Sequence, residues 1–152
     1  MTAGPELPFA SVSPSRPAAP HGSVAGPRVE VDTGLRFQQI AGFGGSFTDS
    51  SAFLIDRELD AAERERAMTL LFDPRSGIGL SLLRNPMGAS DYARDVYTYD
   101  DVPEGESDPQ LSRFSIDHDR ESIVPLTRWA KRLNPDLQVF ASPWSAPGWM
   151  KD

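Results

Sequence analysis

The segment LQVFASPWSAPGWMKD, residues 137–152, decides the fold predicted for this chain. Its first five residues, 137–141, form a short apolar run that is typical of a buried strand. A loop rich in proline and glycine follows, and it carries Trp144 and Trp149. Open α/β sheets and α/β barrels bind ligands at the carboxyl ends of their strands. We therefore expect a stiff aromatic loop at such an end, with a surface on which a sugar ring could stack.

Two further apolar stretches precede this one and read as strands of the same sheet. Residues 37–47 contain Gly42, Gly44 and Gly45 among apolar residues, which indicates a strand whose backbone is closely approached by a neighbour. Residues 78–83 are almost entirely apolar, as expected for a parallel strand that is covered on both faces. Arg84 is predicted to close that strand at its mouth.

Helices are predicted between the strands. A short apolar helix is expected over 50–55, capped by Thr48-Asp49. Asp60 and Glu63 then form a capping-box pattern for a longer helix, with a buried face of Ala67, Met68, Leu70 and Leu71 and an end at Asp73-Pro74. A third helix is expected over 123–133, buried through Ile123, Leu126, Ala130 and Leu133. Strands alternating with helices favour a parallel sheet, either doubly wound or a (β/α)8 barrel.

The first 27 residues differ from the rest, because they are rich in proline, alanine, serine and glycine. Such a segment buries too little surface to offset its ordering entropy, so we expect 1–27 to be disordered and 28–152 to form the folded domain. The segment lacks the basic and apolar regions of a signal peptide, and the cellular location stays open. Residues 29–32 alternate in polarity, which predicts a half-exposed strand, either at a sheet edge or in a β-sandwich and not in a barrel.

The composition excludes several function classes. A net charge of -7 argues against a nucleic-acid partner, which favours clustered lysine and arginine. No run of about 18 apolar residues predicts a transmembrane helix. The absence of cysteine excludes disulfides and thiolate metal sites. His118 could share a metal with Asp117 or Asp119, but nothing else has ligand spacing, so a solvated histidine at a helix start is favoured and no metal or cofactor is predicted.

Two other motifs are interpreted structurally. The stretch Gly42-Phe-Gly-Gly-Ser-Phe47 begins like a dinucleotide-binding loop, but the third glycine of that pattern would fall at Phe47. Close backbone packing explains the glycines better. An acidic cluster in the loop 85–117 is expected to be a solvated surface; its members are Asp100, Asp101, Glu104, Glu106 and Asp108.

Six polar or aromatic positions remain as candidates for a binding site. Arg84 needs an anionic or carbonyl partner, either in a salt bridge between loops or in a catalytic carboxylate that it orients. Asp91 could accept two hydroxyl hydrogen bonds from a sugar, although spacing alone favours an exposed loop aspartate. Packing is the default interpretation for Tyr97 and Tyr99. Trp144 and Trp149 favour ligand contact, because prolines and Gly148 stiffen their loop.

Taken together, these motifs resemble glycoside hydrolase family 30, the family of glucosylceramidase. The resemblance is carried by four segments in order: 42–51 (GFGGSFTDSS), 77–91 (GIGLSLLRNPMGASD), 97–100 (YTYD) and 141–151 (ASPWSAPGWMK). Residues before about Val29 have no counterpart in it. The resemblance implies the first three strands of a (β/α)8 TIM barrel with an attached β-sandwich, and cleavage of β-glycosides with retention of configuration.

The same resemblance assigns roles to residues. Arg84 matches an arginine near the nucleophile, Asp91 an aspartate that holds hydroxyls of the bound sugar, and Trp144 a tryptophan beside that sugar. The family's two catalytic glutamates follow strands four and seven, so we expect none before Asp152 and no activity from this chain alone. A partial barrel also leaves sheet edges open, which predicts poor folding in isolation. The expected substrate is a glucosylceramide-like β-glucoside; alternatives are a 1,6-glucan or xylan, or a non-catalytic carbohydrate-binding role.

Overall fold

The computed structural model describes residues 26–27 and 29–151. The predicted disorder of residues 1–27 therefore falls almost wholly outside the described residues. The chain divides into two compact units, 1–38 and 39–152. In the first unit the strand predicted over 29–32 is wrong, because the described residues there are not in a strand and Val29 and Val31 are exposed. A strand needs a partner for its backbone groups, and no described segment pairs with 29–32.

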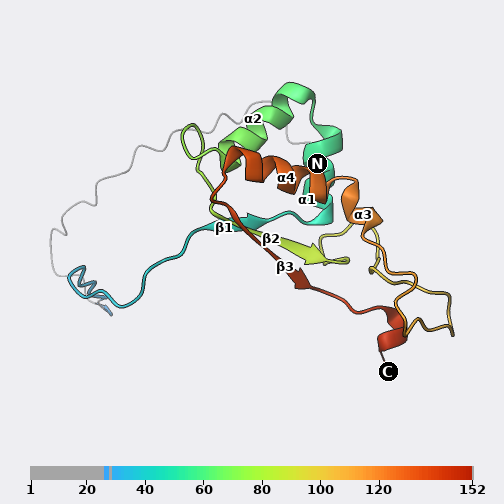
Figure 1. Cartoon of the computed structure of the whole chain (residues 1–152). Coiled ribbons are helices and arrows are strands. Elements are labelled where there is room, and N and C mark those ends of the chain that lie inside the picture. Colours follow the sequence, from blue (N-terminus) through green and yellow to red (C-terminus); the bar gives the residue numbers. More distant parts are fainter. Residues whose placement is uncertain (1–25, 28, 152) are drawn as a thin grey trace. The chain divides into compact units, whose positions relative to one another are not determined.

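The second unit is built on a parallel sheet of three strands in the order β1-β2-β3, shown in Figure 1. The strands are β1 (Gly44–Ser46), β2 (Leu82–Met87) and β3 (Gln138–Pro143). The register places Ser46, Arg84 and Phe140 side by side across the sheet. Because neighbours in register share a face, these three side chains belong to the same face of the sheet.

The first strand approaches the second very closely, as its glycines predicted. The backbone N–H of Phe43 donates to Ser81 Oγ at 3.1 Å, and the N–H of Ser81 donates to the carbonyl of Phe43 at 2.9 Å. A Cβ atom on Gly44 would overlap the carbonyl oxygen of Leu82, whereas one on Gly45 would meet only Leu80 Cδ1 at 4.0 Å. The two strands can therefore pair only with a glycine at position 44.

The second strand begins later than its apolar run suggested. The N–H groups of Ile78 and Leu80 donate to carbonyls at the end of the preceding helix, at 2.8 and 2.9 Å, instead of joining the sheet. Gly79 adopts a left-handed conformation with φ +60°, which also interrupts an extended chain. Arg84 consequently lies within β2 and not at its mouth, which corrects the prediction.

The helices follow the sequence signals closely. They are α1 (Asp49–Phe53), η1 (Leu54–Glu58), α2 (Ala61–Phe72), α3 (Asp117–Arg120), α4 (Ile123–Leu133) and η2 (Gly148–Met150). The side chain of Thr48 caps α1, and Asp60 and Glu63 form the predicted capping box of α2. On α2 the buried residues are Met68 and Phe72, one turn apart, so Leu70 lies off that face and is exposed. None of the described helices combines the length and the apolar character needed to cross a membrane.

The hydrophobic core lies between the sheet and the helices α1, α2 and α4, which lie together on one side of it in Figure 1. Leu83 from β2 meets Met68 and Phe72 of α2 and Leu126 of α4 in this core. On the other face Phe140 is 52% exposed. A barrel and one half of a doubly wound sheet both have helices on this side of successive parallel strands, so the winding by itself fits either.

An ion pair ties the loop after β2 to the start of α1. The backbone N–H and guanidinium of Arg94 donate three hydrogen bonds to the carboxylate of Asp49, at 2.8, 3.0 and 3.0 Å. Burial opposes ionisation of Asp49, but the hydrogen bonds and charge of Arg94 outweigh it and hold the pKa of Asp49 below its ordinary value. The N–H of Ser50 also donates to the carbonyl of Tyr92. These bonds fix the loop that leads to the site.

Gly44→Ala is expected to destabilise the chain by about 1–3 kcal/mol, because its methyl group forces β1 away from β2. Gly45→Ala is the matched control and should change the free energy of unfolding by less than about 0.5 kcal/mol. Urea denaturation followed by circular dichroism measures both. Equal effects of the two variants would show that the close approach at Gly44 does not matter.

Asp49→Asn and Arg94→Met, combined in a double-mutant cycle, should give a coupling energy of about 1–2 kcal/mol at neutral pH. Since the pKa of Asp49 is lowered on folding, this contribution is present above its unfolded pKa and is lost as the pH falls through the folded one. The exposed pair Asp117–Arg120 is the control, with a coupling below about 0.5 kcal/mol. A coupling no larger than that of the control would contradict the proposed anchor.

Candidate functional site

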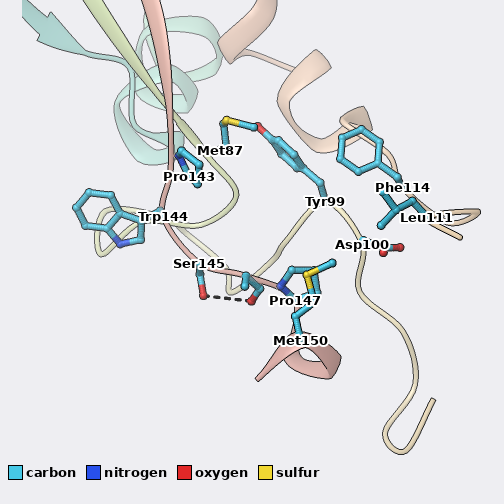
Figure 2. Close-up of a pocket in the computed structure, with 11 residues that line it drawn as sticks. Met87, Tyr99, Asp100, Leu111, Phe114, Pro143, Trp144, Ser145, Pro147 and Met150 are labelled. Carbon is cyan, nitrogen blue, oxygen red and sulfur yellow. Dashed lines mark hydrogen bonds between the residues drawn. The ribbon is translucent and has the colours of Figure 1, made fainter. Parts of the chain in front are cut away.

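A pocket of about 340 Å³ lies at the carboxyl ends of β2 and β3 (Figure 2). Met87 and Pro143 end these strands and form one wall. The loop 144–147 and Met150 of η2 form a second wall. The third comes from the long loop between β2 and α3, through Tyr99, Asp100, Leu111 and Phe114. The lining is mostly apolar, and it stands at the end of the sheet where α/β folds bind their ligands.

Trp144 stands at the edge of this pocket, with its ring directed away from Tyr99 and Phe114 in Figure 2. Its backbone N–H donates to the carbonyl of Met87 at 3.2 Å, so the loop begins anchored to β2. The guanidinium carbon of Arg84 lies 5.1 Å from the centre of the indole ring, a cation–π distance. Trp144 is 47% exposed. The structure thus brings together two of the residues singled out from the sequence, Arg84 and Trp144.

The guanidinium of Arg84 still has hydrogen-bonding capacity to spare. Its Nε atom is buried and has no hydrogen-bond partner among the described residues, and the same holds for Oγ of Ser46, its register neighbour on β1. Within that part of the chain Arg84 also forms no ion pair, so the expected alternative of a salt bridge between two loops is not formed there.

Asp91 lies in an exposed turn of the loop after β2. Within residues 26–27 and 29–151 its carboxylate takes part in no hydrogen bond or ion pair, with Arg84 and Trp144 or with any other residue. The turn is stabilised by its neighbours, because the N–H of Tyr92 donates a hydrogen bond to Ser90 Oγ at 3.2 Å. Asp91 therefore presents free carboxylate oxygens to solvent.

Tyr97 and Tyr99 pack inside the loop, as expected. Both hydroxyls donate to the carboxylate of Asp119 at the start of α3, that of Tyr97 at 2.8 Å. Burial, reinforced by these bonds, raises the pKa of both phenols, so they remain protonated donors. His118 does lie at the start of α3, but its ring stacks on Tyr97 with centroids 3.6 Å apart. The predicted place at a helix start is confirmed, but the ring is only partly solvated, with 29% of the side chain exposed.

The acidic cluster is also less solvated than its sequence suggested. Asp100 and Asp108 are only 2% and 6% exposed, because the loop folds back onto the segment after β3. Trp149 holds this contact, since its Nε1 donates to the backbone carbonyl of Asp100 at 3.1 Å. Trp149 is thus partly buried and acts as a packing residue, unlike Trp144.

The pocket includes residues that the sequence did not single out, chiefly Met87, Leu111, Phe114 and Met150. They are scattered over three segments, and only folding brings them together. No periodic pattern marks them. Across the described ranges, 26–27 and 29–151, no group of three or more histidine, aspartate or glutamate side chains is placed to hold a metal ion.

Comparison with known proteins identifies the architecture. Residues 40–152 match the glycosyl hydrolase family 30 TIM-barrel domain. The chain is 39% identical over 115 residues to an endo-1,6-beta-D-glucanase of Trichoderma harzianum, and 36% identical over 118 residues to the lysosomal acid glucosylceramidase of Mus musculus. These alignments cover 75% and 76% of this chain, and 23% and 22% of the two relatives.

A solved endo-beta1,6-glucanase superimposes with a TM-score of 0.67 at 27% identity, over 79% of this chain and 25% of that structure. The chain therefore spans about a quarter of the length of the curated relatives it matches. These matches also decide between the two windings that the sheet allows, in favour of the barrel. The chain belongs to glycosyl hydrolase family 30, and its three parallel strands and their helices are a part of that family's TIM-barrel domain.

Proposed function

We propose that this segment forms part of the sugar-binding face of a hydrolase that cleaves β-glycosides with retention of configuration. The observation that carries the proposal is the half-exposed ring of Trp144, anchored at the carboxyl end of β3 and stacked against the guanidinium of Arg84. A sugar presents C–H groups on its faces and hydroxyls at its rim. A rigid indole face suits the first, and nearby charged groups suit the second.

Asp91 is the proposed partner for sugar hydroxyls. Its carboxylate is exposed and accepts no hydrogen bond from the described residues, so it can accept two from neighbouring hydroxyls of one ring without giving up an existing bond. Asp91 is not proposed as acid, base or nucleophile.

Arg84 is proposed as a supporting residue. Its buried Nε has no partner among the described residues, and a buried guanidinium group left unpaired is costly. A carboxylate on the uncovered face of the sheet would satisfy it. In a retaining glycosidase that carboxylate would be one of a pair about 5–5.5 Å apart. The arginine would orient it and lower its pKa, which keeps it ionised for attack.

The proposed substrate is a β-glucoside of the glucosylceramide type, and the runner-up is a 1,6-glucan or xylan. Relatives named as glucosylceramidases and as endo-1,6-glucanases match with similar identity, 36% and 39%. Hydrolysis of glucosylceramide, 1,6-glucan and xylan by a protein that carries this segment in a complete barrel separates these substrates. Turnover of none of them would sink the proposal.

A non-catalytic carbohydrate-binding role is the candidate from a different class. The same exposed features, Trp144 and Asp91, would serve it. Calorimetry of this chain with methyl β-glucoside distinguishes the two: saturable binding by the chain alone favours the binding module, since a partial sugar site is expected to bind only weakly.

In the longer protein, Asp91→Ala is expected to lower kcat/KM by at least about tenfold, equivalent to ~1.4 kcal/mol for a lost sugar hydrogen-bonding group. Asp95→Asn, an exposed carboxyl in the same loop, is the matched control and should leave kcat/KM within about twofold. Steady-state kinetics with an aryl β-glucoside measures both. An unchanged value for Asp91→Ala would make Asp91 an ordinary loop residue.

A further inference from the structure

Asp100 is the most unusual ionisable group in the described part of the chain. Both of its carboxyl oxygens are buried, and neither has a hydrogen-bond partner there. A carboxylate in such a position would forfeit its hydration without compensation. A neutral carboxylic acid avoids that cost, but its O–H then needs an acceptor.

Asp108 is the neighbouring group to which such an O–H can donate. It faces Asp100 from the same loop and is itself 6% exposed. Its own oxygens already accept from Ser112 Oγ at 2.9 Å and from the backbone N–H of Arg113 at 2.6 Å. Those donors favour the ionised form of Asp108 and hold its pKa below the ordinary value, whereas burial and the charge of Asp108 raise the pKa of Asp100. A proton shared by the two groups is therefore favoured on Asp100 over Asp108.

The pair lies where the two loops of the candidate site meet. The backbone carbonyl of Asp100 accepts the indole N–H of Trp149, which fixes the segment that begins at Trp144. The turn held by Asp108 includes Leu111, a non-glycine residue at φ +54° whose side chain lines the pocket. That conformation is strained and persists only because the surrounding bonds determine it.

We propose that Asp100 is a positioning residue: it holds a proton shared with Asp108, and this acid–carboxylate pair keeps the loop after β3 in place beside the candidate site. The inference rests on the proposed function only in that it takes Trp144 as the residue on which the sugar stacks. Arg113 is the other charged group facing Asp100, and it is already paired with Glu106 at 2.9 Å. The packed segment Gly148–Met150 contributes no ionisable side chain.

The sign of the pH dependence follows from this arrangement. A pKa raised on folding gives a stabilisation that is complete below the unfolded pKa and is lost as the pH rises through the folded pKa of Asp100. The lowered pKa of Asp108 gives a stabilisation that is lost as the pH falls through its folded pKa. The pair is therefore most stabilising between these two folded pKa values.

The test is the unfolding of the full 152-residue chain and its Asp100→Asn variant in urea, as a function of pH. The asparagine amide can donate to Asp108 but cannot ionise. The ratio of the folding equilibrium constants, variant over wild type, is expected to increase at least about tenfold from about pH 4 to about pH 9. Asp108→Asn should abolish most of this increase, and Asp95→Asn, an exposed carboxyl of the same loop, should show none.

A second readout separates positioning from general stability. The chain contains three tryptophans, so the indole N–H signal of Trp149 can be assigned by comparison with Trp149→Phe. The position of this signal should change with pH, with the same midpoint as the difference in stability. In Asp100→Asn it should no longer change with pH. The proposal is overturned if the ratio of folding equilibrium constants does not depend on pH. It is also overturned if the indole signal shows the same pH dependence in Asp100→Asn as in the wild type. Neither measurement uses a sugar, so failure here is distinct from failure of the proposed function.

Discussion

The contact between β1 and β2 is the constraint on which the rest of the second unit depends. The carbonyl of Leu82 occupies the space that any side chain at position 44 would need, so the two strands can pair only through a glycine. That pairing sets the register of Ser46 against Arg84, and β3 then adds Phe140 to the same row. The place of Arg84 in this row on the uncovered face of the sheet thus depends on the close approach of the neighbouring strand β1.

The site combines rigid and adaptable parts. Arg84 is rooted in the central strand, while Trp144, Asp91 and Asp100 lie on loops whose backbones are fastened by a few specific hydrogen bonds. The Asp49–Arg94 pair and the bonds of Tyr97 and Tyr99 to Asp119 hold the long loop against α1 and α3. A largely apolar pocket with a few buried polar groups results, and such groups favour one arrangement because the alternatives leave them without partners.

The sequence predicted what depends on local chemistry. The capping box of α2, the cap of α1, the bounds of α4 and the close approach at the glycines all follow from residues within one or two turns of the chain. The start of β2 did not follow, because Ile78 and Leu80 give their N–H groups to the end of α2 and not to the sheet. The strand expected over 29–32 needed a partner that no local pattern can supply.

The residues of the site could also be predicted only in part from the sequence. Arg84 and Trp144 could be named from their places beside apolar runs, and they do meet. The burial of Asp100 and the packing of His118 could not, since both depend on segments about 50 and 20 residues away in the sequence. Nothing in the local composition distinguishes the buried Asp100 from the exposed Asp101.

The spatial order of the strands repeats their order along the chain. A polypeptide leaving the ribosome amino end first would therefore find, for each new strand, a neighbour that has already been synthesised. Each strand can therefore pair as soon as it emerges, without waiting for a segment that has still to be synthesised.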